Sequence, residues 1–244
     1  MMSQFSTADA FWSFTQEIAL QSRYLRSADV ENFLNAVART CHGRRRLIDK
    51  GTIFWRAQVG HDWVVDPEQG GRVRGPHSES RMKPLQDRAY EGRVNPKGIP
   101  CLYFATTREA AMSEVRPWIG SVVSVARFRT VRDVAAVDCS VLHGAELERS
   151  GDLSPDEIER IVWANIDHAF SRPVTRSDNT AEYAATQILA EVFQKQDFDG
   201  VVYKSAFSAE GYNVAFFDLS CAEQIESSLF QVESAKFSFK EIDG

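Results

Sequence analysis

Residues 51–59, GTIFWRAQV, are the first stretch of the chain whose side chains alternate as a β-strand requires. Every second position is apolar, and this set consists of Ile53, Trp55, Ala57 and Val59. The pattern predicts that one face of the strand is buried in a sheet, while Arg56 shares a partly buried opposite face with Phe54. A sheet therefore begins at this stretch.

The residues before this strand follow a helical period instead. The first predicted helix starts from a cap at Ser6, and its apolar positions are Phe11, Phe14 and Ile18. A second helix is predicted over residues 27–40. We therefore expect an N-terminal helical extension over residues 1–48, followed by one main domain over residues 49–244.

Between this extension and the strand, residues 44–46 form a run of three arginines. Such a run is typical of a solvated helix end or loop, and a phosphate-binding role is the alternative. Farther along, residues 66–95 are polar and rich in glycine, proline and charge. They predict a long loop of the kind that often carries function.

A strand and a helix are predicted after this loop. Residues 99–105 form a short apolar run that is typical of a buried strand. Thr106 and Thr107 then offer a cap for a helix, which should stop near Pro117.

Two capping motifs predict the longer helices. Residues 154–157, SPDE, have the cap, first-turn proline and third-position glutamate of a capping box, so a helix should run to about Phe170. Asn179 with Glu182 resembles the same box and predicts a second helix that ends at about Gln196.

The remaining strands are predicted over residues 120–129, 131–137, 201–203, 213–218 and about 229–239. Strands do not alternate strictly with helices, as a doubly wound fold would require. The sequence therefore predicts an α+β domain.

Composition excludes several classes of function. The net charge is -6, from 34 acidic and 28 basic residues, so we expect no direct binding of nucleic acid. The four cysteines are widely spaced, which predicts neither a zinc site nor a disulfide framework, and no metal is expected. No apolar run approaches the ~18 residues of a membrane span and no leader pattern is present, so the expected location is cytoplasmic.

Glu114 is the most informative anomaly in the sequence. It falls within an apolar helical stripe made of Ala110, Ala111, Val115 and Trp118. A buried carboxylate is costly unless it is paired, so this helix should have either a cation or a cleft beneath it. An ordinary buried ion pair is the alternative interpretation.

Three further residues raise a similar question. Arg56 could pair with Glu114, hold a phosphate in a forked contact, or be a plain surface arginine. Tyr103 lies in an apolar strand, where a core aromatic is the usual role, and Ser205 follows a strand end, where ligand-binding and ordinary turn serines both occur.

Taken together, these residues and their surroundings resemble the RES domain, a family named for an arginine, a glutamate and a serine and found in toxin-antitoxin modules. The stretch covered runs from about residue 51 to 218. The matching segments are residues 54–57 (FWRA), 92–98 (GRVNPKG), 102–105 (LYFA), 110–115 (AAMSEV), Tyr183 with residues 186–187 (TQ), and residues 199–205 (DGVVYKS).

The resemblance implies a fold like that of the ADP-ribosyltransferase toxins, with a split β core and helices around a cleft that binds NAD. It implies an NAD phosphorylase or NAD glycohydrolase, which cleaves the nicotinamide–ribose bond and transfers ADP-ribose to inorganic phosphate or water. NAD would be a substrate, and no cofactor is expected. The alternatives are a protein ADP-ribosyltransferase and a non-catalytic domain that binds a nucleotide or a partner.

Carried over by position, the family's catalytic residues fall on Arg56, Tyr103, Glu114 and Ser205. The full set predicted to bind NAD is Arg56, Arg93, Asn95, Tyr103, Tyr183, Gln187, Ser205 and Asn213. A carboxylate can stabilise the positive charge that develops on the ribose, and an arginine can hold a pyrophosphate or an incoming phosphate.

The chain also departs from the family pattern. Trp55 stands where smaller members of the family often carry tyrosine, and Val94 stands where an aromatic residue often follows the Gly-Arg pair, so the wall of the cleft and its stacking surface should differ. A helical insertion at about residues 140–180 and the N-terminal extension exceed a minimal RES domain; they could cap the cleft, bind a partner or form a homo-oligomer interface. The partner implied by the family is a small antitoxin with a helix-turn-helix part.

Overall fold

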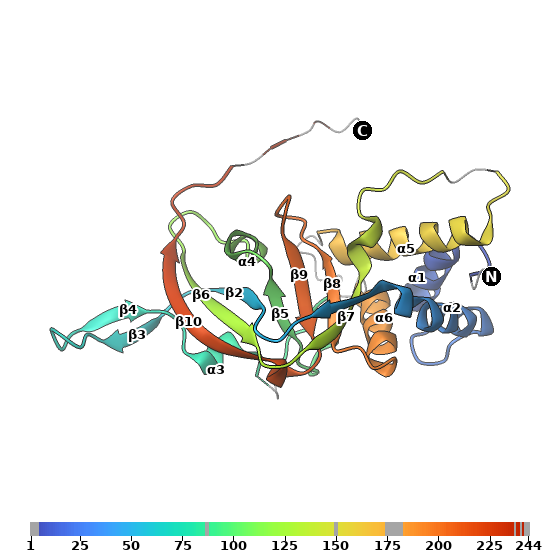
Figure 1. The fold of residues 1–244 in the computed structure, drawn as a ribbon. Coiled ribbons are helices and arrows are strands. Elements are labelled where there is room, and N and C mark those ends of the chain that lie inside the picture. Colours follow the sequence, from blue (N-terminus) through green and yellow to red (C-terminus); the bar gives the residue numbers. More distant parts are fainter. Residues whose placement is uncertain are drawn as a thin grey trace.

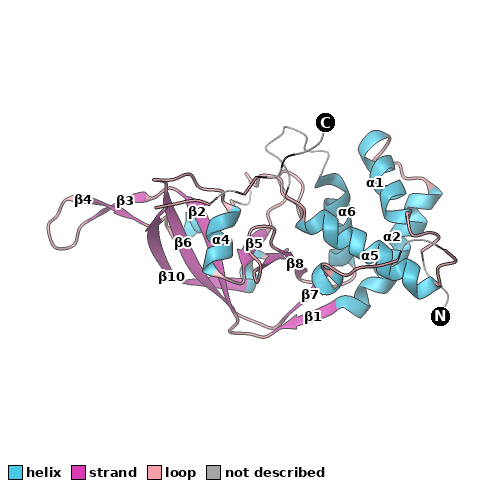
Figure 2. Ribbon diagram, turned by 90° about the horizontal axis from the view of Figure 1, so that it is seen from above, coloured by secondary structure: helices cyan, strands magenta, loops and turns pink. Residues whose placement is uncertain are grey.

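The fold is described from a computed structural model, which covers residues 5–85, 88–148, 151–173, 183–236, 238–239 and 241. These residues form an eight-stranded sheet, with a cluster of helices at one of its ends (Figures 1 and 2). The strands lie in the order β1 (Arg45–Ile48), β7 (Val134–Asp138), β8 (Gly200–Lys204), β9 (Tyr212–Phe216), β5 (Leu102–Ala105), β2 (Ile53–Val59), β6 (Val122–Thr130) and β10 (Ala222–Gln231). The predicted α+β class is confirmed.

The sheet splits in the middle, between β2 and β5. Neighbouring strands are antiparallel except β7 and β8, which are parallel. Most neighbours pair along several residues, but β2 and β5 are joined by the single pair Trp55 and Ala105. The two halves of the sheet therefore diverge beyond this pair, which leaves room for a cavity.

Four helices cover one face of the half that contains β7, β8 and β9. They are α1 (Ala10–Leu20), α2 (Ala28–Thr40), α5 (Pro155–Ser171) and α6 (Ala184–Lys195), and Figure 1 shows them gathered at this end. Their shared core includes Trp163 stacked on Phe193, and it continues onto Val201 of β8. The N-terminal helices thus pack directly against the rest of the chain, while the predicted domain boundary stays a prediction.

The other half of the sheet is covered by the short helix α4 (Arg108–Glu114), which packs on Ala57 and Val125. A second core fills the opposite face of the sheet, where the rings of Phe54, Phe104 and Phe128 pack together. Both faces of β2 are therefore covered. The face predicted to be partly buried is covered more fully than expected at Phe54, which is 3% exposed, while Val59 of the face predicted to be buried is half exposed.

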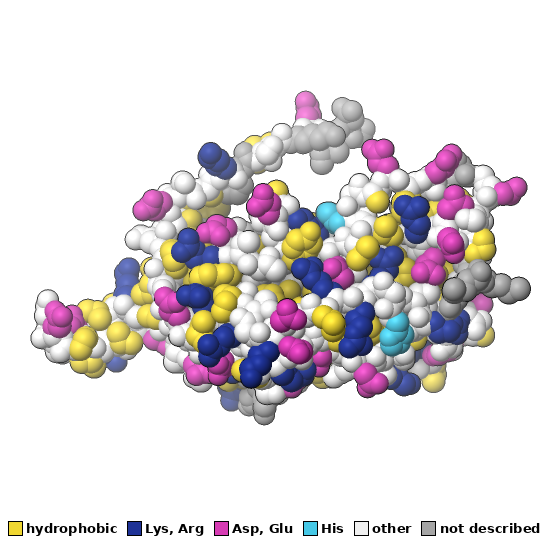
Figure 3. All heavy atoms as spheres, viewed as in Figure 1, with side chains coloured by type: hydrophobic (Ala, Val, Ile, Leu, Met, Phe, Trp, Pro, Cys, Tyr) yellow, Lys and Arg dark blue, Asp and Glu magenta, His cyan; other side chains and the backbone are white. Residues whose placement is uncertain are grey.

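An arm projects from the sheet at residues 62–75 (Figure 1). It is a two-stranded ribbon of β3 (Asp62–Val65) and β4 (Arg72–Gly75), followed by the short helix α3 (Glu79–Met82). Figure 3 shows hydrophobic side chains on this arm, and Trp63 and Val65 are more than half exposed. The expected loop over residues 66–95 therefore contains a strand and a helix.

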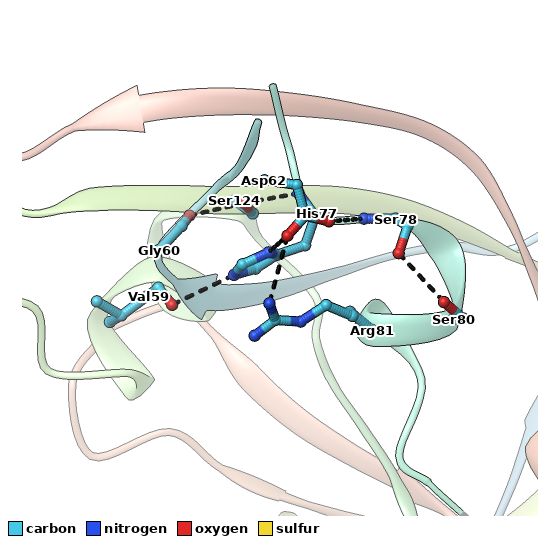
Figure 4. A network of polar contacts seen from close by, with 8 residues as sticks. All are labelled: Val59, Gly60, Asp62, His77, Ser78, Ser80, Arg81 and Ser124. Atoms are coloured by element: carbon cyan, nitrogen blue, oxygen red, sulfur yellow. Dashed lines mark hydrogen bonds and ion pairs between the residues drawn. The ribbon is translucent and has the colours of Figure 1, made fainter. Parts of the chain in front are cut away.

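A polar network holds the base of the arm (Figure 4). Asp62 accepts hydrogen bonds from His77, Arg81 and the backbone amide of Ser78, while Ser124 Oγ accepts one from the His77 amide and donates one to the carbonyl of Gly60. Such long-range pairing is invisible in the local sequence pattern, which shows only polar residues and glycines.

The local boundaries divide into confirmed and corrected predictions. The capping box of Ser154 and Glu157 is present at the start of α5, and Thr107 caps α4 through the amide of Ala110. The cap of α1 is Asp9 rather than Ser6, and its side chain makes no capping hydrogen bond. The proposed second box at Asn179 and Glu182 lies outside the described residues.

The arginine run lies partly as predicted, since it includes a helix end and Arg45 and Arg46 are exposed. Arg44 ends the 3-10 helix η1 (Cys41–Arg44) and stacks on the ring of Trp163, and the next two arginines belong to β1. Two other 3-10 helices are η2 (Cys139–Leu142) and η4 (Leu219–Cys221). No helix in the described part of the chain is long and apolar enough to cross a membrane.

Candidate active site

A cavity of about 350 Å³, here called the Glu114 cavity, lies beneath α4 where β2 and β5 diverge. Its volume is within the usual range for sites that hold small molecules. The lining residues are Trp55, Arg56, Ala57, Gln58, Tyr103, Phe104, Ala105, Ala111, Glu114, Val115, Tyr203 and Asn213. Three of the four predicted catalytic residues therefore share one cavity.

Glu114 is held in place by two neutral donors. Ser205 Oγ and Asn213 Nδ2 each donate a hydrogen bond to Glu114 Oε1, and both distances are 2.7 Å. Within the described residues, no donor reaches the second oxygen and no cation lies within 4 Å of the carboxylate. Glu114 therefore has a fixed orientation and keeps one acceptor oxygen available.

Helix α4 ends at the residue that these two hydrogen bonds hold. Glu114 is the last residue of α4, and Arg116 then adopts the left-handed conformation with φ 45° before Pro117. The predicted stop near Pro117 is thus correct to within one turn. Trp118 was expected on the same helical stripe, but it lies beyond the helix and is 70% exposed, so that part of the prediction was wrong.

The loop after β8 fixes Ser205. Its backbone amide donates to the carbonyl of Gly211, and its Oγ accepts a hydrogen bond from the amide of Phe207. Because Oγ already accepts from Phe207, its own proton is directed to Glu114. Ser205 is buried and stands directly behind the carboxylate, so its contact with the cavity is made through Glu114.

Arg56 carries a buried charge that is poorly compensated. Its guanidinium bridges the split in the sheet by donating to the carbonyl of Tyr103 at 2.9 Å, and its Nε is buried without a hydrogen-bond partner. Burial lowers the pKa of Arg56 to about 10. No carboxylate of the described residues lies within 4 Å of the Arg56 guanidinium. The ion pair with Glu114, one of the alternatives that the sequence left open, is therefore not formed. A bound anion would supply the missing partner.

Tyr103 presents its ring to the cavity, but its hydroxyl group is already engaged. The hydroxyl donates to Asn95 Oδ1 at 2.6 Å and accepts from the amide of Val94 at 3.0 Å. Burial raises the pKa of Tyr103 well above its usual value. Gly92 lies so close that a Cβ there would stand 2.5 Å from the tyrosine oxygen. Tyr103 can therefore offer a flat face but no free hydroxyl.

Two residues that were predicted to bind the substrate support the loop around Asn95, which contacts the Tyr103 hydroxyl. Asn95 Nδ2 donates to three backbone carbonyls of its own loop, and its Oδ1 accepts from Tyr103. Gln187 Nε2 donates to the carbonyls of Gly92 and Asn95 at 2.9 and 3.1 Å. Both side chains are buried and neither lines the cavity, so their geometry fits a positioning role.

Arg93 and Tyr183 are the two remaining residues of the set predicted to bind NAD. The guanidinium of Arg93 is 5.9 Å from the ring of Tyr183 and donates to the carbonyl of Ala169. Neither residue lines the Glu114 cavity. Arg93 is nonetheless close enough to lower the pKa of Tyr203, which burial raises overall. Their assignment to NAD binding stays a prediction.

Trp55, which the sequence placed at the wall of the cleft, lines the cavity as expected. Sequence reasoning missed Gln58 as a functional candidate, and it passed over Tyr203 although that residue stands inside a quoted motif. Both also line the cavity. Tyr203 pairs with Asn213 across β8 and β9, and this register places both side chains on the same face of the sheet. The available signal was an aromatic residue two positions before Ser205.

Comparison with known proteins gives one clear family. The sequence model of the RES domain family matches residues 53–239, a range that includes every residue lining the cavity. Among solved structures, a chain of the M. tuberculosis MbcT-MbcA toxin-antitoxin complex matches with a TM-score of 0.44 and 16% identity, over 80% of this chain and 92% of that one. No curated protein matches the chain.

Proposed function

The chain belongs to the RES domain family, and from that membership together with the geometry of the Glu114 cavity we propose that it cleaves the nicotinamide–ribose bond of NAD. ADP-ribose is transferred to inorganic phosphate or water. The proposal includes the role of a toxin in a toxin-antitoxin pair, as the family resemblance implies.

One observation carries the proposal: a fixed carboxylate and a poorly compensated buried guanidinium line the same cavity. Glu114 is oriented by Ser205 and Asn213, and Arg56 lacks an anionic partner among the described residues. NAD has the complementary charges, because its pyrophosphate is anionic and its ribose becomes cationic as nicotinamide leaves. A site organised before the substrate binds stabilises such charge without reorganisation.

The chemistry assigns a role to each group. The bond between ribose C1′ and the nicotinamide nitrogen breaks, and its electron pair leaves with neutral nicotinamide. Glu114 stabilises the positive charge that develops on the ribose, and an oxygen of phosphate or water then forms the new bond to C1′. Arg56 holds an anionic group, and the ring of Tyr103 supplies an apolar surface for the nicotinamide or the ribose.

The partner in this proposal is a cognate antitoxin. The family resemblance implies a small protein with a helix-turn-helix part that blocks the cavity until it is removed.

The test is to incubate the purified protein with NAD, with and without inorganic phosphate, and to follow nicotinamide by chromatography. Wild-type protein should release nicotinamide, and a dependence on phosphate would identify phosphorolysis rather than hydrolysis. Glu114→Gln should lower the rate by about 10²- to 10³-fold, the usual effect of removing one group that stabilises a transition-state charge.

Glu109→Gln is the matched control. Glu109 lies on the same helix but faces solvent, where it pairs with Arg108, so this variant should release nicotinamide at the wild-type rate. If neither condition yields nicotinamide, a protein acceptor is tested with labelled NAD. Absence of transfer there as well would leave a binding domain without turnover and overturn the proposal.

A further inference from the structure

A second pocket lies on the other side of Ser205, outside the Glu114 cavity. Its volume is about 730 Å³, and we call it the His143 pocket. It is formed by His143 after η2, by the end of α5 and by the loop after β8. The lining residues are His143, His168, Ser171, Arg172, Pro173, Lys204, Ser205, Ala206, Phe207, Ser208 and Ala209. The five residues from His143 to Pro173 in this set lie within the predicted insertion at about residues 140–180.

The lining of the His143 pocket is rich in cations and hydrogen-bond donors. It contains two histidines, Arg172 and Lys204, and no carboxylate is among the lining residues described. Arg172 is exposed and forms no ion pair within the described part of the chain. The C-terminal end of α5 contributes about half a negative charge, which one guanidinium outweighs. The net field therefore favours an anion.

His143 is oriented by a buried carboxylate. Its Nδ1 lies 2.8 Å from Asp167 Oδ2, and Asp167 is only 4% exposed. Burial raises the pKa of Asp167, while the hydrogen bond with His143 lowers it in part. An ionised Asp167 accepts the Nδ1 proton, so this contact fixes the half-exposed ring and turns Nε2 away from the carboxylate.

The hydroxyl groups of the loop after β8 add neutral donors. Ser208 Oγ accepts a hydrogen bond from the amide of Gly211, which leaves its proton for another acceptor. Lys204 is held beside this loop by a hydrogen bond to the carbonyl of Ala209 and by the ring of Tyr212. A hydroxyl, an ammonium, an imidazole and a guanidinium that meet in one pocket match the several acceptor oxygens of a phosphate group.

We propose that the His143 pocket binds a phosphate group beside Ser205, with the His143 imidazole and the Arg172 guanidinium as its main hydrogen-bonding partners. Ser205 links this group to the catalytic carboxylate, because its Oγ donates to Glu114. Two sources share this chemistry, inorganic phosphate as the acceptor and the pyrophosphate of NAD, and only the choice between them rests on the proposed function.

The test measures binding directly, by calorimetry with inorganic phosphate in the absence of NAD. Loss of one charge-assisted hydrogen bond should weaken binding by about tenfold or more, so His143→Asn and Arg172→Gln are each expected to do so. His42→Asn and Arg74→Gln remove the same groups from exposed positions elsewhere and should bind phosphate as wild type does. Melting temperatures verify that all four variants fold.

A second arm identifies the source of the phosphate, using Glu114→Gln to suppress turnover. If NAD displaces inorganic phosphate, the pocket holds the pyrophosphate of NAD; if both bind together, it holds the acceptor. Phosphate that fails to bind, or that binds equally to His143→Asn, Arg172→Gln and wild type, overturns the inference. Loss of phosphate binding in Arg56→Gln alone would also overturn the inference, because phosphate would then occupy the Glu114 cavity. Binding that depends on His143 without any nicotinamide release would leave this site standing while the proposed function fails.

Discussion

Glu114 and Asp62 are two carboxylates that receive similar numbers of hydrogen bonds in very different settings. Asp62, at the base of the arm, has both oxygens engaged and two of its three donors are His77 and Arg81 (Figure 4). Glu114 receives only neutral donors, both on one oxygen, and lines a cavity.

This difference separates a structural network from a functional one. Around Asp62 the polar groups satisfy one another, so the network fixes the arm and needs no ligand. Around Glu114 no cation of the described residues compensates the charge, and the same cavity contains Arg56 with an unsatisfied Nε. Unpaired charges are costly to bury, so such an arrangement is maintained where a ligand completes it.

Among the variants that compare these two networks, Arg56→Met should have the largest effect. We expect nicotinamide release to fall by about 10- to 100-fold, because one or more charge-assisted hydrogen bonds to the substrate are lost. The free energy of unfolding should rise or stay the same, since a buried charge that has no anionic partner among the described residues is replaced by an apolar side chain of similar length. Urea denaturation measures the free energy of unfolding, and a loss of more than about 1 kcal/mol would show that the hydrogen bond from Arg56 to the Tyr103 carbonyl outweighs the cost of the buried charge.

Ser124→Ala should have the opposite signature. It removes the acceptor for the His77 amide and the donor to Gly60, in a fully buried position, so the free energy of unfolding should fall by about 1–3 kcal/mol. Nicotinamide release per folded molecule should not change. A large loss of activity with unchanged stability would contradict the structural role of this network.

Ser205→Ala is the matched substitution at the candidate site. It removes one of the two donors to Glu114, and we expect nicotinamide release to fall by about tenfold. The free energy of unfolding should fall less than it does in Ser124→Ala, because the Glu114 carboxylate keeps its hydrogen bond from Asn213. Equal destabilisation of the two alanine variants would remove the distinction between the networks.

The smallest effect is a dependence on pH. The hydrogen bond from the Ser78 amide, followed by that from His77, lowers the pKa of Asp62. A carboxyl group with a lowered pKa stabilises the fold above its unfolded value of about 4, and this contribution is lost as the pH falls through the folded value. The stability difference between wild type and Asp62→Asn should therefore shrink between about pH 5 and pH 3. A stability difference that grows as the pH falls through this interval would contradict the prediction.

Local sequence signals predicted those parts of the fold that depend on neighbouring residues. The cap at Ser154 and the end of α4 before Pro117 are formed by contacts a few residues apart, so a pattern of three or four letters was sufficient. The arm was missed because β3 and β4 stabilise one another across a polar turn, and its base is fixed by Ser124, 47 residues from His77.

At the candidate site, the sequence by itself determined that a carboxylate falls on the apolar side of a short helix, and that Arg56 lies in a strand whose alternate residues are apolar. The family motifs then determined which residues to compare. Only the tertiary structure decided their partners, because Ser205 and Asn213 reach Glu114 from 91 and 99 residues away along the chain. The tertiary structure likewise showed that Asn95 binds the Tyr103 hydroxyl and that Gln187 holds the Asn95 backbone. Such pairing between distant segments depends on the register of the whole sheet, which no local pattern encodes.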